Sequence, residues 1–264
     1  MPDASHIDPT RDEIHVRVRD LKKSYGNTVI LKGLTFDMRR GLTNVILGAS
    51  GSGKTVFLRQ LIRLEKPDSG QIIVDGQDIA PLSELELFEV RRKFGMVFQM
   101  SALFDSMDVF DNVAFPLREH SKLSRGEIKS KVEEALSALG VAHAIRKLPS
   151  ELSGGMKKRV AVARAIVMQP EILIYDEPTT GLDPITSRTV DDLIEETGER
   201  FGVTSVVISH DMESVFRMGH WVTLLYKGQI EASLPREEFA RSDNEHVREI
   251  LTASGVKIPG LEPA

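Results

Sequence analysis

The stretch Gly48-Ala49-Ser50-Gly51-Ser52-Gly53-Lys54-Thr55 decides the fold of this chain. It follows the apolar run Val45-Ile46-Leu47 and precedes helical periodicity at residues 57–64, so a strand, a glycine-rich turn and a helix are expected in that order. The glycines let several backbone N–H groups point at phosphate oxygens, and the helix N-terminus adds partial positive charge. Lys54 can then reach the β- and γ-phosphates, and Thr55 offers a hydroxyl to Mg²⁺. The alternative, a flexible Gly/Ser turn before a helix, is disfavoured by the flanking strand and helix.

Two carboxylates follow a later apolar run. The segment Ile172-Leu173-Ile174-Tyr175-Asp176-Glu177 is typical of a buried strand that carries both acids to the sheet edge where open α/β sheets bind ligands. Asp176 suits the Mg²⁺ shell through a bridging water, and Glu177 is the candidate general base that polarises the attacking water. Taken alone, two acids after a strand fit a solvated loop equally well.

Polar residues also follow two other apolar runs. His210 comes after residues 205–208, and beside a phosphate cradle it can contact the γ-phosphate and sense hydrolysis, although a lone histidine there is usually a loop residue. Gln99 follows residues 95–98, and its amide can bind Mg²⁺ or water on one side and follow movement of a helical subdomain on the other. The expected catalytic residues are Glu177, His210, Lys54 and Gln99, and the expected metal site comprises Thr55, Gln99 and Asp176.

The order of apolar runs predicts an α/β fold. Short Val-, Ile- and Leu-rich runs alternate with longer stretches of helical periodicity, which is the pattern of βα units around a buried sheet. In the first forty residues, Ile14, Val16 and Val18 alternate with polar residues and indicate an N-terminal antiparallel β subdomain with one solvated face. The expected core strands are residues 43–47, 95–98, 171–175 and 205–208, and residues 221–226 and 229–233 are expected to form a late hairpin.

A helical insertion interrupts this alternation. Between about residues 106 and 169 the strand signal vanishes and helices dominate, with Asp108 and Ser124 as expected N-caps. We therefore expect an α-helical subdomain inserted at about residues 100–169 of a main domain that spans residues 14–240. Residues 1–13 carry acids and prolines and are expected to be a flexible tail.

The last residues, 241–264, are expected to form a helix and an extended tail. Ser242 or Asp243 can cap a helix whose Val247, Ile250 and Leu251 share one face, and Gly255 can end it. The tail that follows, residues 256–264, has alternating apolar residues and two prolines, so it could lie along a second copy of the chain. A frayed terminus is the alternative.

The composition limits the classes of function. A net charge of -5 gives no general field to hold nucleic acid, so nucleic acid is not an expected partner. The absence of cysteine from 264 residues excludes disulfides, thiolate zinc sites and cysteine nucleophiles. The longest apolar runs are far shorter than the ~20 residues that cross a bilayer, so a membrane role must come through a partner.

The segment Leu152-Ser153-Gly154-Gly155-Met156 indicates the family. Its small residues leave backbone N–H groups exposed at the start of an expected helix, which gives a second anion site besides the cradle. The segment resembles the LSGGQ signature of ABC ATPases. This resemblance implies a P-loop ATPase core in which ATP and Mg²⁺ are held between the cradle of one copy and the signature of a second copy, as an ATP-sandwich dimer.

The other elements of that family fall in order over about residues 14–240. Tyr25 matches the aromatic residue that stacks on adenine, Gln99 the Q-loop and Gly181-Leu182-Asp183 the D-loop. Asp176, Glu177 and His210 match the Walker B acid, the catalytic glutamate and the switch histidine. The nucleotide-binding set implied by the resemblance is Tyr25, Gly48, Ala49, Ser50, Gly51, Ser52, Gly53, Lys54, Thr55, Val56, Gln99, Ser153, Gly154, Gly155, Asp183 and His210.

The sequence departs from the family pattern at two positions. Val56 stands where many relatives carry a second hydroxyl after the cradle lysine, so one contact to the α-phosphate is missing. Met156 replaces the usual signature glutamine, and a thioether cannot donate a hydrogen bond. The expected donors from Ser153 and the glycine backbone are intact, so these changes affect fine tuning and not activity.

Residues 98–119 narrow the resemblance. The segments Phe98-Gln99-Met100-Ser101-Ala102-Leu103-Phe104-Asp105-Ser106-Met107 and Val109-Phe110-Asp111-Asn112-Val113-Ala114-Phe115-Pro116-Leu117-Arg118-Glu119 are similar to the ATPases of MCE-linked lipid transporters such as the maintenance-of-lipid-asymmetry (Mla) system, and Asp183-Pro184-Ile185-Thr186 fits the same group. ABC ATPases receive the coupling helix of their permease at this segment. The apolar side chains that could line that groove are Leu103, Phe104, Met107 and Phe110. The alternative is that they pack between subdomains.

The resemblance implies an ATP-hydrolysing subunit that powers phospholipid transport between membranes. Its implied partners are separate permease subunits, an MCE-type lipid-binding protein and a small accessory regulatory subunit, which would hold it peripherally at the cytoplasmic face of the inner membrane. Two rivals remain open. An ABC ATPase for the import or export of another cargo shares every catalytic residue, whereas a non-transport ABC regulator usually carries two ATPase units, coiled coils or cysteine zinc sites that this chain lacks.

Overall fold

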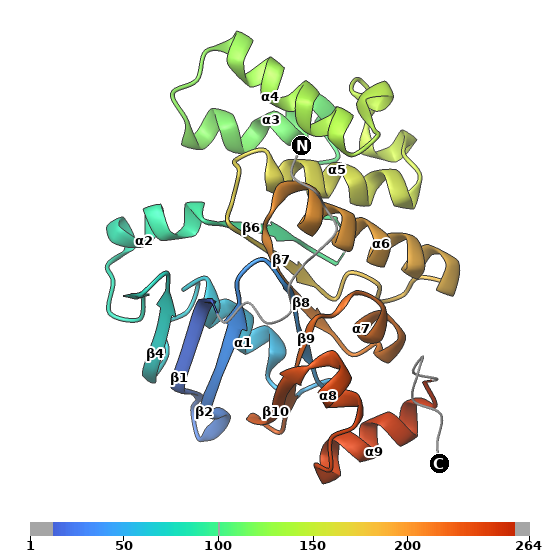
Figure 1. The fold of residues 1–264 in the computed structure, drawn as a ribbon. Coiled ribbons are helices and arrows are strands. Elements are labelled where there is room, and N and C mark those ends of the chain that lie inside the picture. The colour runs from blue at the N-terminus through green and yellow to red at the C-terminus, as the bar shows by residue number, and fades with distance from the viewer. Residues whose placement is uncertain (1–12, 100, 257–264) are drawn as a thin grey trace.

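The computed structural model describes residues 13–99 and 101–256, and these residues form two sheets (Figure 1). The larger sheet has the order β10-β9-β3-β8-β7-β6, with β3, β6, β7, β8 and β9 parallel and β10 antiparallel to β9. The smaller sheet has the order β2-β1-β4-β5 and is antiparallel. The strands are β1 (Ile14–Tyr25), β2 (Thr28–Arg39), β3 (Thr43–Leu47), β4 (Ser69–Val74), β5 (Gln77–Asp78), β6 (Phe94–Val97), β7 (Ile172–Asp176), β8 (Thr204–Ser209), β9 (Trp221–Tyr226) and β10 (Gln229–Pro235).

Helices surround the larger sheet. In Figure 1, α3, α4 and α5 lie together at one end of the molecule, and α6 and α7 lie beside the parallel strands. The helices are α1 (Lys54–Leu61), α2 (Glu84–Arg92), α3 (Val109–His120), α4 (Arg125–Ala138), α5 (Gly154–Ile166), α6 (Pro184–Phe201), α7 (Met212–Met218), α8 (Arg236–Ala240) and α9 (Glu245–Ser254), with short 3-10 turns at Ala142–Ala144 and Pro149–Glu151.

The two faces of the larger sheet pack against different apolar cores. Successive side chains of a strand point to opposite faces, so Ile46 of β3 joins the core formed with α1 and the smaller sheet, whereas Val45 and Leu47 join the core formed with α5, α6 and α7. The rings of Phe36 and Phe57, 5.2 Å apart, pack β2 against α1. Burial on both faces fixes the sheet, and with it the positions of the residues at the carboxyl ends of its strands.

The predicted fold class is confirmed. The strand β3 has the predicted bounds, and β6, β7 and β8 differ from prediction by one residue at each end. Asp108 and Ser124 cap α3 and α4 by accepting hydrogen bonds from the backbone N–H groups of Asp111 and Glu127. Among the described residues, no helix is long and apolar enough to span a membrane.

The C-terminal helix α9 forms as predicted, but with a different cap. The Asn244 side chain accepts from the N–H groups of His246 and Val247, so Asn244 is the N-cap and the prediction of Ser242 or Asp243 was wrong. The Ser242 hydroxyl instead accepts from the Asn244 N–H in the preceding turn. Gly255 ends the helix at φ 61°, as predicted. The tail lies outside the described residues from 257 onward, and its role at a second copy stays a prediction.

A polar cluster around the buried His15 joins the two sheets at the edge where the parallel strands begin. His15 of β1 is 1% exposed, and its Nδ1 lies 2.7 Å from Thr204 Oγ1 at the start of β8. Its Nε2 lies 3.5 Å from carboxylate oxygens of both Asp75 and Glu171. These three side chains could together hold a metal ion, but Arg40 and Lys93 already pair with both carboxylates, so the cluster is neutralised without one.

This cluster predicts a pH-dependent stability. Burial lowers the pKa of His15, the Arg40 charge lowers it further, and Asp75 and Glu171 raise it by less. In the unfolded chain, His15 therefore takes up a proton near its ordinary pKa of about 6.5. In the folded chain, His15 stays neutral at that pH. The free energy of unfolding should fall as the pH drops from 6.5 toward the lowered pKa of the folded state. In thermal melts, His15→Asn should show a smaller loss of Tm between pH 7.5 and 5.5 than wild type; the exposed His143→Asn should match wild type, and equal losses in all three would contradict this account.

Candidate active site

The glycine-rich stretch forms a tight loop between β3 and α1. Gly48 donates its N–H to the carbonyl of Ser209, and a Cβ on Gly48 would lie 2.4 Å from the Leu225 carbonyl oxygen, so only glycine fits. Gly53 has φ 110° and ends the loop, and α1 begins at the next residue, three positions earlier than predicted. Ser52 lies inside this loop, and its buried Oγ has no hydrogen-bond partner among the described residues. A curled backbone with an unused hydroxyl fits the shape and the chemistry of a phosphate group.

Lys54 points its ammonium group back into the loop. Its Nζ donates to the carbonyl oxygens of Gly48 at 2.6 Å and Ala49 at 3.1 Å, and its side chain is 6% exposed. The same Nζ lies 3.5 Å from Glu177 Oε1. Lys54 therefore places a positive charge between the cradle and the acidic strand end, where it can meet phosphate oxygens. Ala49, Ser50, Gly51 and Thr55 are exposed around it.

The carboxyl ends of neighbouring strands bring the other predicted residues to the same edge. In the parallel registers, Leu47 of β3 pairs with Ser209 of β8, and Asp176 of β7 pairs with Ile208. Glu177 and His210 directly follow β7 and β8, so they lie next to the cradle that follows β3. These side chains therefore lie at one sheet edge, as the sequence predicted.

Glu177 is held in a defined position by three groups. Its backbone has φ 45°, unusual for a residue with a Cβ, and its N–H donates to the Ile208 carbonyl. Its Oε2 accepts a hydrogen bond from Thr180 Oγ1 at 2.8 Å and lies 3.0 Å from His210 Nδ1. Burial raises the pKa of Glu177, but the Thr180 hydrogen bond and the charges of His210 and Lys54 together outweigh it, so the pKa lies below its usual value. The ionised carboxylate can accept a proton from water.

Asp176 lies in a different environment although it is the neighbouring residue. Burial and the adjacent Glu177 raise the pKa of Asp176, and Lys54 lowers it only in part. No hydrogen bond or ion pair to the Asp176 carboxylate occurs among the described residues, so its oxygens are available. A divalent cation would favour the ionised carboxylate here, since it supplies the missing positive charge. Thr55, in the first turn of α1, offers a hydroxyl for the same cation.

Gln99 and Tyr25 lie further from the cradle. Gln99 follows β6, which is separated from β3 by β7 and β8, and its exposed side chain makes no hydrogen bond to Lys54, Asp176 or Glu177. The carbonyl of Gln99 accepts from Lys158 Nζ at 2.5 Å. Tyr25 ends β1 with a ring that is 44% exposed, and its hydroxyl donates to Glu65. Lys23 Nζ lies 5.7 Å from the centre of this ring, and the exposed part of the ring can stack on a planar group.

The signature segment forms the start of α5. Ser153 caps the helix by accepting from the Met156 N–H at 3.3 Å, and Gly154 and Gly155 have open space where a Cβ would lie. The first turn of α5 contains no acidic residue, so the partial positive charge of the helix end is uncompensated. Figure 1 shows α5 among the upper helices and α1 beside β2 in the lower half. Within one chain, the two predicted anion sites therefore do not meet.

Asp183 caps α6 and holds the loop after Glu177. Its Oδ1 accepts from the N–H groups of Ile185 and Thr186 at 3.0 and 3.1 Å. Val56 and Met156, the two departures from the family pattern, are partly buried and pack against the two apolar cores. Thr180 and Lys158 were missed by the sequence argument. A threonine three residues after Glu177 is a weak signal, and one lysine within a helix is none.

The predicted apolar groove is only partly correct. A groove of about 740 Å³ lies between α2, α3 and α5, and Phe104 lines it together with Phe88, Phe98 and Phe115. Leu103, Met107 and Phe110 do not line it. Leu103 and Phe110 pack against the apolar core instead, and Arg118 and Arg146 cover the Phe110 ring. Sequence spacing could not separate these roles, because this segment is a loop followed by a helix and has no single period.

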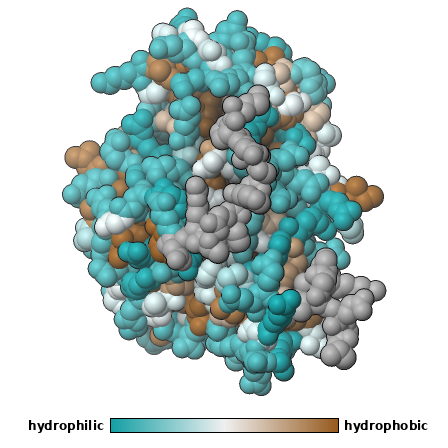
Figure 2. All heavy atoms as spheres, viewed as in Figure 1, coloured by the Kyte–Doolittle hydropathy of each residue, from teal (hydrophilic) through white to brown (hydrophobic). Residues whose placement is uncertain are grey.

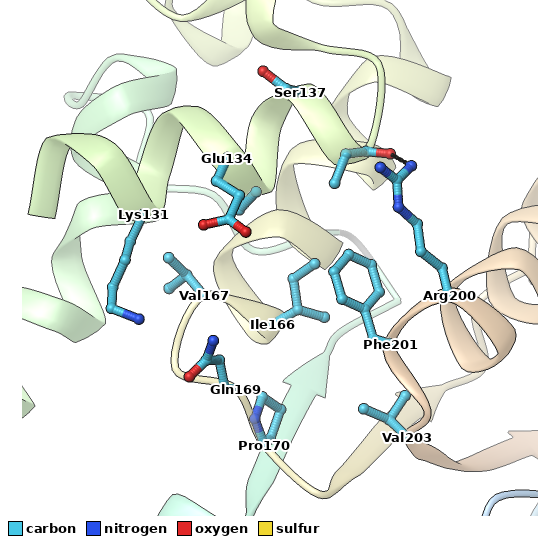
Figure 3. A pocket seen from close by; sticks show the side chains of 12 residues that line it. Lys131, Glu134, Ser137, Ile166, Val167, Gln169, Pro170, Arg200, Phe201 and Val203 are labelled. Carbon is cyan, nitrogen blue, oxygen red and sulfur yellow. Dashed lines mark hydrogen bonds between the residues drawn. The ribbon is translucent and has the colours of Figure 1, made fainter. Parts of the chain in front are cut away.

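A second hollow lies away from the site. Figure 3 shows this space of about 620 Å³ between α4 and the C-terminal ends of α5 and α6, with Glu134, Arg200 and Phe201 around it. None of the residues predicted to bind nucleotide lines it. The face of the molecule in Figure 2 is mostly hydrophilic, with hydrophobic residues scattered in small groups.

The chain is similar to known proteins over most of its length. Residues 31–180 match the family model described as ABC transporter. A probable ribonucleotide transport ATP-binding protein, mkl, of Mycobacterium leprae is 40% identical over 248 residues, which cover 94% of this chain and 72% of the relative. The intermembrane phospholipid transport system ATP-binding protein MlaF of Escherichia coli K12 is 40% identical over 236 residues, which cover 89% of this chain and 88% of the relative.

Solved structures show the same architecture. The protein cbiO1 of Clostridium perfringens, part of the ABC transporter complex cbiONQ, superposes with a TM-score of 0.81 at 32% identity, covering 91% of this chain and 96% of that one. A dimeric ATP-binding cassette in a post-hydrolysis state, bound to ADP and Pi, gives a TM-score of 0.73 at 31% identity, covering 84% and 98% of the two chains.

Proposed function

The chain belongs to the ABC transporter family of ATP-binding proteins, and we propose that it is the ATP-hydrolysing subunit of a transporter that moves phospholipid between membranes. The observation that carries the ATPase assignment is that Lys54 and His210 both meet Glu177 at one sheet edge. Lys54 Nζ lies 3.5 Å from Glu177 Oε1, and His210 Nδ1 lies 3.0 Å from Glu177 Oε2. The cradle backbone and Ser52 hold the triphosphate, and the exposed ring of Tyr25 stacks on the adenine. Thr55 and Asp176, with Gln99 in the segment after β6, would hold Mg²⁺, which would neutralise charge on the phosphates.

In this assignment, Glu177 is the general base that accepts the proton of the attacking water. Its carboxylate is ionised and held by Thr180, so it can orient a water molecule in line with the γ-phosphate and accept its proton. Lys54 stabilises the charge that develops on the phosphoryl oxygens. His210 contacts Glu177 Oε2 at 3.0 Å and can follow the γ-phosphate through that contact. The chain thus supplies a base, a fixed positive charge and a sensor at one edge.

We assign the second half of each site to another copy of the chain. The start of α5 offers an uncompensated helix dipole and open glycine backbone, yet it does not meet the cradle of its own chain. An antiparallel pair of copies would bring each signature against the other's cradle, with Gly181 and Asp183 near the contact. The dimeric cassette with ADP and Pi supports this arrangement, because it has the same fold.

The cargo and the partners rest on resemblance. The phospholipid transport ATP-binding protein MlaF supports a lipid cargo, whereas the relative mkl, at equal identity, is named for ribonucleotide transport. The segment from Phe98 to Glu119 favours the lipid system, in which permease subunits, an MCE-type lipid-binding protein and a small accessory subunit would complete the complex. The chain would then lie peripherally at the cytoplasmic face of the inner membrane. An ATPase for another cargo is the second candidate, and mkl is the observation that favours it.

The groove gives the test of the permease assignment. Phe104 is 42% exposed and packs on Phe115 with ring centres 5.0 Å apart, so it can receive an apolar helix from a partner. Phe104→Asp should release the permease from the complex while ATP binding by the free subunit persists. Phe201→Asp, at a similarly exposed ring (38%) in the other hollow, should keep the permease bound. Affinity purification from the native membrane, with identification of co-eluting proteins, measures both and also identifies a lipid or a nucleotide system.

If the permease still co-purifies with the Phe104→Asp subunit and transport continues, the groove is not the docking site. If no membrane-spanning protein co-purifies with the wild-type subunit, the transporter assignment itself is wrong.

A further inference from the structure

Side chains of α5, the helix that begins with the signature, also bind the backbone of the segment after β6. Lys158 of α5 donates from Nζ to the Gln99 carbonyl at 2.5 Å. Arg164, six residues further along the same helix, donates from Nη1 to the Ala102 carbonyl at 2.7 Å and from Nη2 to the Ser101 carbonyl at 3.0 Å. One helix therefore binds three backbone carbonyl groups that follow β6.

Lys158 is buried and Arg164 is partly buried, and in the described part of the chain both lack an acidic partner. Lys158 is 7% exposed, and among the described residues neither Lys158 nor Arg164 forms an ion pair with a carboxylate. Charged side chains are rarely buried unless they are paired, since burial removes the water that stabilises them. An apolar side chain of similar length would fill the same space at lower cost. The two cations are therefore explained by the carbonyl groups they bind.

The gripped backbone has an unusual conformation. Ser101 has φ 63° and Ala102 has φ 44°, both in the left-handed region that residues with a Cβ rarely adopt. Two such residues in succession persist only where their surroundings hold them in place. The guanidinium of Arg164 binds the carbonyl groups of these same two residues through two separate nitrogens of its planar fork, a geometry that the single ammonium nitrogen of a lysine does not reproduce.

These contacts connect the Gln99 segment, the signature at the start of α5 and the groove that contains Phe104. Gln99 is assigned to the ATP of its own chain, whereas Ser153 at the start of α5 is assigned to the ATP of the second copy. Lys158 lies five residues after Ser153 on a continuous helix, so the distance between Gln99 and Ser153 is set along that helix. Arg164 also lines the groove with Phe104, and its guanidinium carbon lies 5.8 Å from the centre of that ring.

We propose that Lys158 and Arg164 are positioning residues that fix the backbone of Gln99 to the signature helix, so that Gln99 and the signature move as one body when the dimer closes. This inference rests on the proposed function, because that function assigns Gln99 and Ser153 to opposite ATP sites. A displacement of Phe104 in the groove would move Arg164, and through Arg164 it would shift both Gln99 and the signature helix.

Hydrogen exchange and kinetics together test the proposal. In Lys158→Met and Arg164→Met, amide exchange should rise in peptides that cover residues 98–104 and stay at the wild-type level in peptides of β7 and β8. The maximal ATPase rate should fall about tenfold or more, since small misplacements of catalytic groups have large effects, while ATP affinity stays within about twofold. Lys158→Arg should recover at least half of the rate. Lys129→Met, an exposed lysine of α4, is the matched control and should change nothing.

The outcomes separate this proposal from the ATPase assignment. Wild-type exchange in residues 98–104 of both methionine variants, together with wild-type rates, would overturn the positioning role alone. An inactive wild-type chain would overturn the ATPase assignment. The exchange result alone would then test whether Lys158 and Arg164 hold the backbone of residues 98–104. If the methionine variants lose protection throughout, Arg164→Lys decides: it keeps the charge and loses the fork, so exchange should rise only in residues 98–104, and unchanged exchange there contradicts the proposal.

Discussion

Glu177→Gln is expected to lower steady-state ATP hydrolysis by about a hundredfold or more, because a positioned general base contributes at least that factor. The amide can still orient water through its oxygen, but it cannot accept a proton. ATP binding should survive, since the cradle and Lys54 are unchanged and the substitution removes a negative charge 3.5 Å from Lys54 Nζ. Phosphate release and equilibrium ATP binding, measured on the same preparation, give both quantities.

A control variant separates the loss of the base from a general change in charge. Glu196→Gln replaces an exposed glutamate of α6 and should hydrolyse ATP at the wild-type rate. Residual hydrolysis above about a tenth of wild type in Glu177→Gln would reject Glu177 as the base.

Ser153→Asp is expected to abolish ATP turnover, by about a hundredfold or more, without destabilising the chain. Ser153 caps α5, and aspartate is an equally good N-cap, so the helix should form as before. The new carboxylate would lie where the proposal places the triphosphate bound to the second copy, and the two negative charges would repel. The Tm should stay near the wild-type value, and ATP binding by the single chain should be unchanged because its own cradle is intact.

Ser153→Asn is the matched variant. Asparagine also caps helices well, carries no charge and keeps hydrogen-bonding groups at the same position. It should lose about tenfold or less in turnover. Equal losses in the Asp and Asn variants would show that the hydroxyl geometry matters and the charge does not, which contradicts an anion at this helix end.

The sequence predicted well which residues meet at the carboxyl edge of the larger sheet, because their positions follow from local rules. A glycine-rich turn after a strand and acids at strand ends are fixed by backbone geometry and by parallel pairing, so Lys54, Glu177 and His210 meet where expected. The short strands were placed to within one residue because their Val- and Ile-rich runs are buried on both faces.

Contacts between distant segments could not be predicted in this way. The groove role of Phe104 and the core role of Phe110 depend on how a loop leaves β6, and no periodicity encodes that path. Lys158 reaches the Gln99 carbonyl across 59 residues of sequence, and nothing in its neighbours marks it. The Asn244 cap was missed for a simpler reason, since three adjacent residues, Ser242, Asp243 and Asn244, are all good N-caps.

The oligomeric mass of the Glu177→Gln chain with saturating MgATP tests the central claim most directly. In sedimentation velocity, the account predicts that this chain moves from the 29.4 kDa of a single copy to twice that mass when MgATP is added, because ATP stays bound between cradle and signature when it cannot be hydrolysed. With Ser153→Asp added, the mass should remain that of a single chain. A Glu177→Gln chain that binds MgATP and still sediments as a single copy would contradict the shared ATP site.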